Sequence, residues 1–176
     1  MESVLSAFET ESHSIALPGY RWITFTVHKA KQPLGLFSAR GVVDTLFHDS
    51  AFVREHLTFG LEPEITHGPY LLNKIFPTDW VELPLPPKLH PVLNAVMEGS
   101  GVYEGCAPKP DENTIAEIAK GLAKIPNPSS YFFLQLDPTK NEDRLSEIGY
   151  ILCEYSQHLF VSLALDQVHS VTVGCD

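Results

Sequence analysis

Residues 159–173 read LFVSLALDQVHSVTV, two apolar runs separated by the polar pair Asp166 and Gln167. Two such runs with a short polar break are typical of a β-hairpin, so strands are expected at 159–165 and 168–173. Upstream, residues 131–136 read YFFLQL and are apolar on both faces apart from Gln135, which predicts an interior strand.

The residues between these strands predict a helix. Thr139 and Glu142 fit the Thr-x-x-Glu capping box, and apolar residues recur at helical spacing from Leu145 to Tyr155. The resulting C-terminal β-α-β-β unit predicts the α+β class, with a mainly antiparallel sheet and helices packed on one face.

Further elements are expected toward the N-terminus. Residues 20–28 (YRWITFTVH) alternate in the manner of a strand, and 34–38 could add a short one. The apolar spacing of 41–57 predicts one broken helix or two short ones. A helix is expected at 90–98, ended by Gly99, and another from an Asp111 cap to about Lys124.

Seven prolines fall within residues 63–91, which therefore cannot be mostly helix or central strand. The same stretch is rich in large apolar side chains, which favours an ordered, packed excursion over a linker. We therefore expect one domain over residues 1–176, because chains of this length usually form a single domain with one hydrophobic core.

The composition narrows the classes of function. The chain has 176 residues, 44% of them hydrophobic, and a formal net charge of −10, so a disordered tail is excluded. The charge is −3 over residues 1–88 and −7 over 89–176. Such acidity disfavours nucleic acid and anionic membranes as partners and favours a basic protein. No apolar stretch is long enough to span a bilayer, and the N-terminus lacks the basic and apolar regions of a secretory signal, so a cytoplasmic location is expected.

No catalytic motif is evident. The chain has three cysteines, a small and odd number that does not fit a disulfide framework. Its eight histidines do not stand at the spacings typical of metal ligands. Gly99, Gly101 and Gly105 miss the dinucleotide fingerprint by one residue and follow a helix, so a helix cap and a loop are favoured there. We expect no metal and no cofactor, and we lean against an enzyme.

The leading hypothesis is a small acidic binding protein that engages a basic protein partner without catalysis. In size, acidity and α+β character the chain resembles bacterial inhibitor and immunity proteins as a type, although no motif carries that resemblance. The oligomeric state is left open. The partner would contact acidic residues in the C-terminal half: Glu98, Glu104, Asp111, Glu112, Glu117, Glu142, Asp143 and Glu147.

The alternative hypothesis is a small enzyme or small-molecule-binding protein. Its pocket would lie between the sheet and the proline-rich segment, because amphipathic rings there stand beside turns. The expected lining is His67, Tyr70, Trp80, His90 and the loop thiol Cys106.

Overall fold

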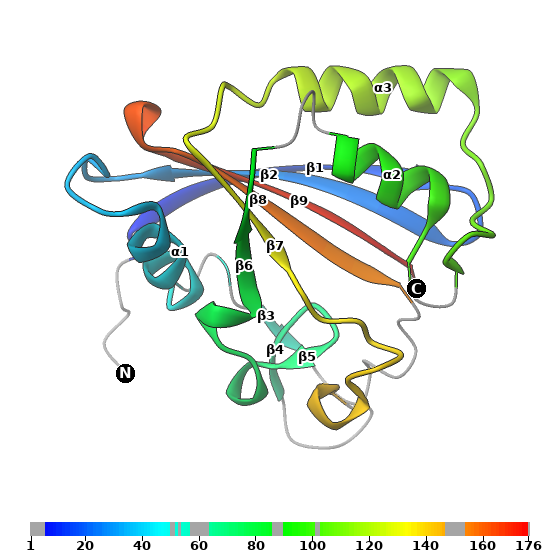
Figure 1. The fold of residues 1–176 in the computed structure, drawn as a ribbon, viewed down its shortest axis with the longest axis horizontal. Coiled ribbons are helices and arrows are strands. Elements are labelled where there is room, and N and C mark those ends of the chain that lie inside the picture. Colours follow the sequence, from blue (N-terminus) through cyan, green and yellow to red (C-terminus); the bar gives the residue numbers. More distant parts are fainter. Residues whose placement is uncertain are drawn as a thin grey trace.

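The computed structural model describes residues 6–49, 52, 54–56, 64–85, 90–100, 103–146 and 154–175. Its main feature is a six-stranded sheet in the order β1-β2-β9-β8-β7-β6, in which every neighbouring pair is antiparallel (Figure 1). The strands are β1 (Phe8–Leu17), β2 (Arg21–Ala30), β6 (Trp80–Leu83), β7 (Ser130–Leu134), β8 (Tyr155–Ser162) and β9 (Gln167–Cys175). The α+β class and the mainly antiparallel sheet are thus confirmed.

The predicted C-terminal hairpin is confirmed as β8 and β9. Their connection is the short 3-10 turn η7 (Leu163–Leu165) followed by Asp166, so it begins three positions before the expected turn pair and ends at its first residue. Asp166 takes the left-handed conformation at φ 53°, which aspartate tolerates better than most residues. Its carboxylate accepts a hydrogen bond from the backbone N–H of Leu34 at 2.6 Å, so the turn is anchored.

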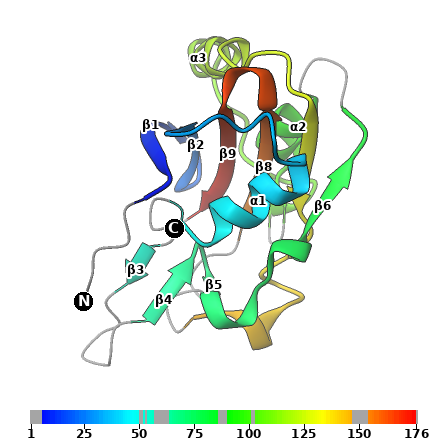
Figure 2. The same cartoon turned by 90° about the vertical axis from the view of Figure 1, so that its left-hand side faces the viewer.

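The helices are divided between the two faces of the sheet, rather than gathered on one. α1 (Ala39–Phe47) packs on the face that includes Leu159, whereas α2 (His90–Glu98) and α3 (Glu112–Ala123) pack on the face that includes Phe160 (Figures 1 and 2). The interior strands β8 and β9 are buried on both sides along almost their whole length, so elements cover each face.

α2 ends and α3 begins at the residues that the sequence signals indicate. Gly99 follows α2 at φ 73°, the left-handed position that favours glycine after a helix. The Asp111 carboxylate accepts from the backbone N–H of Thr114 at 2.7 Å, so the predicted N-cap of α3 is confirmed.

A second sheet corrects the expectation for 41–57. α1 confirms the first part of that helix, but β3 (Arg54–His56) is a strand that pairs with β4 (Glu64–His67), which in turn pairs with β5 (Tyr70–Leu71). Residues 34–38 form a turn rather than a strand. The described part of the proline-rich segment is ordered, since it supplies β4, β5 and the edge strand β6.

The helix expected over 139–155 is wrong where the structure describes it. The 3-10 turn η5 (Glu142–Arg144) is followed by extended Leu145, which bridges to Tyr70. The backbone N–H of Ser146 donates to the Pro69 carbonyl at 2.8 Å, and Tyr155 already belongs to β8. This pairing with a distant segment replaces the helical hydrogen bonds, while 147–153 lie outside the described residues.

Candidate functional site: an acidic-rimmed pocket beside a buried ion pair

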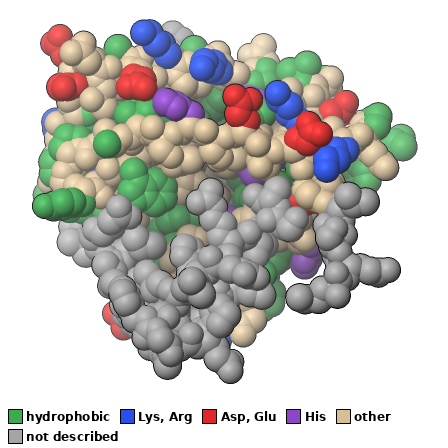
Figure 3. Space-filling view, turned by 180° about the vertical axis from the view of Figure 1, so that it is seen from behind, with side chains coloured by type: hydrophobic (Ala, Val, Ile, Leu, Met, Phe, Trp, Pro, Cys, Tyr) green, Lys and Arg blue, Asp and Glu red, His purple; other side chains and the backbone are tan. Residues whose placement is uncertain are grey.

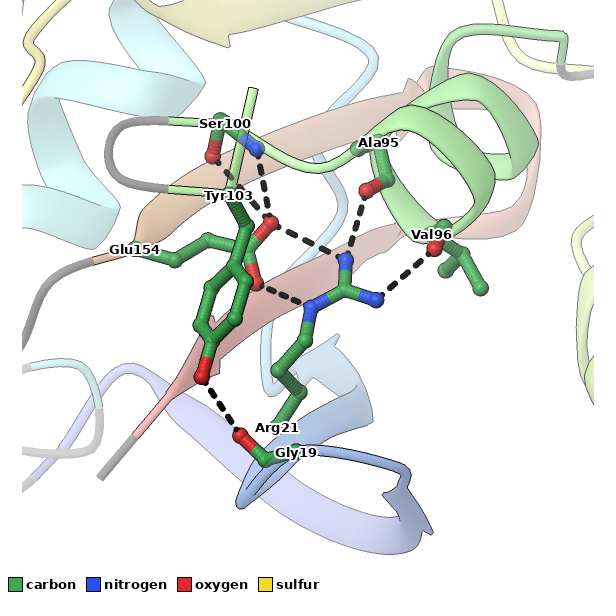
Figure 4. Close-up of polar contacts among 7 residues, drawn as sticks. All are labelled: Gly19, Arg21, Ala95, Val96, Ser100, Tyr103 and Glu154. Atoms are coloured by element: carbon green, nitrogen blue, oxygen red, sulfur yellow. Dashed lines mark hydrogen bonds and ion pairs between the residues drawn. The ribbon is translucent and has the colours of Figure 1, made fainter. Parts of the chain in front are cut away.

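A buried ion pair joins the start of β2 to the residue before β8. The Arg21 Nε donates to Glu154 Oε2 at 2.6 Å and its Nη2 to Oε1 at 3.0 Å, with both side chains 0% exposed (Figure 4). The other guanidinium donors reach the carbonyls of Val96 and Ala95, each at 2.9 Å. These carbonyls lie in the last turn of α2, and the Ala95 carbonyl also accepts from the backbone N–H of Gly99 at 3.0 Å. The positive guanidinium therefore caps the C-terminal end of that helix.

The same carboxylate holds the segment after α2. Ser100 donates its backbone N–H to Glu154 Oε1 at 2.8 Å. Tyr103 places its ring 5.6 Å from the Arg21 guanidinium carbon and donates its hydroxyl to the Gly19 carbonyl at 2.9 Å (Figure 4). We call the ion pair Arg21–Glu154, together with the residues bonded to it, the buried frame. It fixes the described residues of the loop after α2 against one end of the sheet.

A pocket of about 340 Å³ opens beside this frame. Ser100 and Glu104 from the loop after α2 form one side, and the chain that follows β7 forms the other. The walls are largely apolar, as is usual for a ligand site. The lining residues are Gly99, Ser100, Glu104, Phe133, Gln135, Leu136, Asp137, Pro138, Lys140, Asn141, Tyr155 and Ser156.

The mouth of the pocket carries two acids and one base. The Lys140 Nζ lies 2.9 Å from Asp137 Oδ2, and Asp137 Oδ1 accepts from the backbone N–H of Thr139 at 2.9 Å. Burial alone would raise the pKa of Asp137, but the hydrogen bonds from Thr139 and Lys140 outweigh it and lower that pKa. The hydrogen bond to Asp137, together with the charges of Asp137 and Glu104, raises the pKa of Lys140.

Three further exposed acids are adjacent in the sequence to lining residues. Glu98 precedes Gly99, and Glu142 and Asp143 follow Asn141. Among the described residues that line the pocket, Lys140 is the one base and Glu104 and Asp137 are the acids, so their formal charge balance is negative. A cation is therefore the ligand charge that this mouth favours.

The wall also contains an unsatisfied polar atom. The hydroxyl oxygen of Ser156 is buried and has no hydrogen-bond partner among the described residues. A buried hydroxyl without a partner costs free energy.

Three residues of the sequence-predicted pocket come together, but inside the core. His67 and Trp80 have ring centroids 5.4 Å apart, and both point to Gln157 Oε1, His67 through Nε2 and Trp80 through Nε1, each at 2.9 Å. Tyr70 is 0% exposed, and its ring packs edge-on against Tyr155. These side chains fill the interior, so they brace the sheet instead of lining the pocket described above.

The other two residues of that prediction lie elsewhere. His90 begins α2, and its side chain lies outside the described residues. Cys106 is exposed on the loop after α2, and its backbone N–H donates to the Tyr103 carbonyl at 3.0 Å. Within the described ranges, no three His, Cys, Asp or Glu side chains converge as metal ligands do.

The acidic residues predicted to meet a partner are divided. Asp111, Glu112 and Glu117 belong to α3 and its cap at the top of the molecule in Figure 1, whereas Glu142 and Asp143 belong to η5 at the bottom. Glu98 and Glu104 lie beside the pocket, and Glu147 lies outside the described residues. The back of the molecule shows acidic and basic side chains interspersed (Figure 3).

The ion pair and the pocket walls were not predicted from the sequence. Arg21 and Glu154 are 133 residues apart, and neither stands in a local motif. Asp137 was visible as a residue directly after an interior strand, but its Asp-Pro-Thr context also predicts the turn that it forms.

Comparison of the chain with protein-family models, with curated proteins and with solved structures gives no match. Of the helices in the described part of the chain, none has the length and apolarity needed to cross a membrane.

Proposed function

We propose that this chain is a non-catalytic binding protein that receives a basic side chain of a partner protein in the pocket beside Ser100. The observation that carries the proposal is the combination of apolar walls with a negative mouth, where Glu104 and Asp137 outnumber Lys140. The proposal keeps the basic partner expected from the sequence. It places the contact with that partner at one end of the sheet, near Glu98, Glu104, Glu142 and Asp143.

The pocket suits the chemistry of lysine and arginine. Both side chains bury an apolar stem while the charged head binds carboxylates, and the lining residue Phe133 offers a ring to the stem or to the cation. The Lys140 amine competes for Asp137, but its side chain is 71% exposed. Exposed ion pairs contribute little, so an incoming cation can displace Lys140 at small cost.

A capture experiment tests the proposal. The tagged chain is used as bait in a lysate of its source cells at low and at high salt, beside the variants Glu104→Gln and Glu82→Gln. Glu82 is an exposed acid on β6 that does not line the pocket, and its change to glutamine removes the same charge as Glu104→Gln. We expect a basic protein to be retained at low salt by the wild type and by the Glu82 variant, and to be lost with Glu104→Gln.

Retention of nothing at low salt would contradict the proposal, as would equal retention by the two variants. The alternative of a pocket at His67, Tyr70 and Trp80 has less support, since these three side chains are buried in the core.

A further inference from the structure

The two edges of the main sheet differ in how they are protected. β6 is an edge of four residues, preceded by the turn η2 (Pro77–Asp79) and followed directly by Pro84. β1 is an edge of ten residues that pairs with β2 in unbroken register from Phe8 opposite Ala30 to Leu17 opposite Arg21. It contains neither proline nor lysine, the residues that usually guard an edge against pairing with another chain.

The middle of β1 is also exposed to solvent. The six consecutive residues 9–14 are all exposed, although successive side chains of a strand point to opposite sides of the sheet. Both faces of this stretch are therefore largely open to solvent, and α3 reaches one of them at His13. A long, regular strand left open in this way is a template for one more strand.

The side chains along β1 form two rows of different chemistry. One row contains the hydroxyls of Ser12 and Ser14, which already bond across to Thr26 at 2.9 Å and Thr24 at 2.7 Å. The other row contains Glu9, Glu11 and His13. The Nε2 of His13 lies 3.3 Å from Glu117 Oε1 on α3, so this row runs along the α3 side.

We propose that two copies of this chain associate through antiparallel pairing of β1 with β1, about a two-fold axis that passes through Ser12. In this register Glu11 lies opposite His13 of the second copy, and Thr10 lies opposite Ser14, on both sides of the axis. The carboxylate meets an imidazole, and the hydroxyl pairs within each sheet extend across the junction. Two-fold closure gives one isologous interface, the commonest form of protein self-association.

The experiment measures mass by sedimentation velocity from micromolar to several hundred micromolar protein, in 0.15 M salt so that repulsion between copies of net charge −10 is screened. We expect reversible dimerisation of the wild type. E11K places lysine opposite the imidazole of His13, and H13E places glutamate opposite Glu11. Because symmetry counts every cross-strand pair twice, each variant should raise the dissociation constant by about two- to thirtyfold. The double variant E11K/H13E restores opposite charges at both positions and should recover the dimer.

The control is E82K on the opposite edge, a charge change equal to that of E11K, which should leave the dimer intact. A wild type that stays monomeric over the whole range would overturn the proposal. So would dimers that survive both single variants, because another surface would then hold the copies together. The capture of a basic partner does not depend on this result, so the two proposals fail separately.

Discussion

His158 and His28 show what burial does to single ionisable side chains in this sheet. His158 lies within β8, and desolvation lowers its pKa to about 3. His28 lies in β2, and burial, together with the nearby His67, lowers its pKa to about 4. Both imidazoles are therefore neutral in the folded chain, where they serve as interior polar groups. The Tyr131 hydroxyl lies 2.8 Å from His158 Nδ1, which gives one of them a partner.

These two histidines make stability depend on pH. Unfolding returns them to pKa values near 6.5, so between pH 6.5 and about 4 the unfolded chain binds protons that the folded chain does not. The free energy of unfolding should therefore fall as the pH is lowered from 7 to 5, by up to about 1.4 kcal/mol per pH unit for each histidine. Urea denaturation across this range measures the slope.

The variant His158→Phe serves as the control, since it keeps a ring but removes one titrating group. Its slope between pH 7 and 5 should be smaller than that of the wild type, whatever its absolute stability, and the remainder should come from groups such as His28 and His169, whose pKa values burial also lowers. An unchanged slope would mean that His158 does not stay neutral in the folded chain.

For helices and strands, sequence patterns predict an element correctly where the side chains of that segment determine its structure. α3 begins at its Asp111 cap and ends at Ala123, beside the Lys124 end point that the spacing indicates. β1 gives no such signal, because its central residues are polar on both faces and show no alternation. The segment around Leu145 carries a helical pattern but pairs with Pro69 and Tyr70, a contact that only the folded chain supplies.

The approach of α3 to the sheet depends on Gly121. A Cβ at this position would lie 2.7 Å from the ring of Phe25 on β2. Alanine in place of a helical glycine ordinarily stabilises by about 1 kcal/mol, but overpacking costs about 1–3 kcal/mol. We expect Gly121→Ala to lower the free energy of unfolding by about 1 kcal/mol, as measured by urea denaturation.

The exposed residue Ala123 provides the matched control on the same helix. Ala123→Gly should lower stability by about the helix propensity difference alone. The double variant Gly121→Ala with Phe25→Leu should be less destabilised than the sum of its single changes, because the contact is shared. Stabilisation by Gly121→Ala would show that the helix does not approach the sheet this closely.

At the scale of the whole molecule, the fold brings distant segments to one end of the sheet. Arg21 from β2, the last turn of α2 and Glu154 before β8 form a buried frame, and the pocket lies between that frame and the turn after β7. The sequence predicts the strands β2, β7 and β8 and the helix α2 one by one. It does not predict the pocket, because no local sequence pattern shows which ends of these elements lie next to one another in the fold. The net acidity is visible in the composition, but the excess of acids over bases among the described lining residues of the pocket is not.

The measurement that tests the central claim most directly is an NMR titration of the isotope-labelled chain with N-acetyl-arginine amide, with N-acetyl-norleucine amide as the uncharged control. We predict that the arginine compound shifts the resonances of Phe133, Tyr155 and Asn141, that the norleucine compound shifts them much less, and that Glu104→Gln weakens the response several-fold. Shifts spread over α1 and α3, or equal shifts with both compounds, would contradict the account.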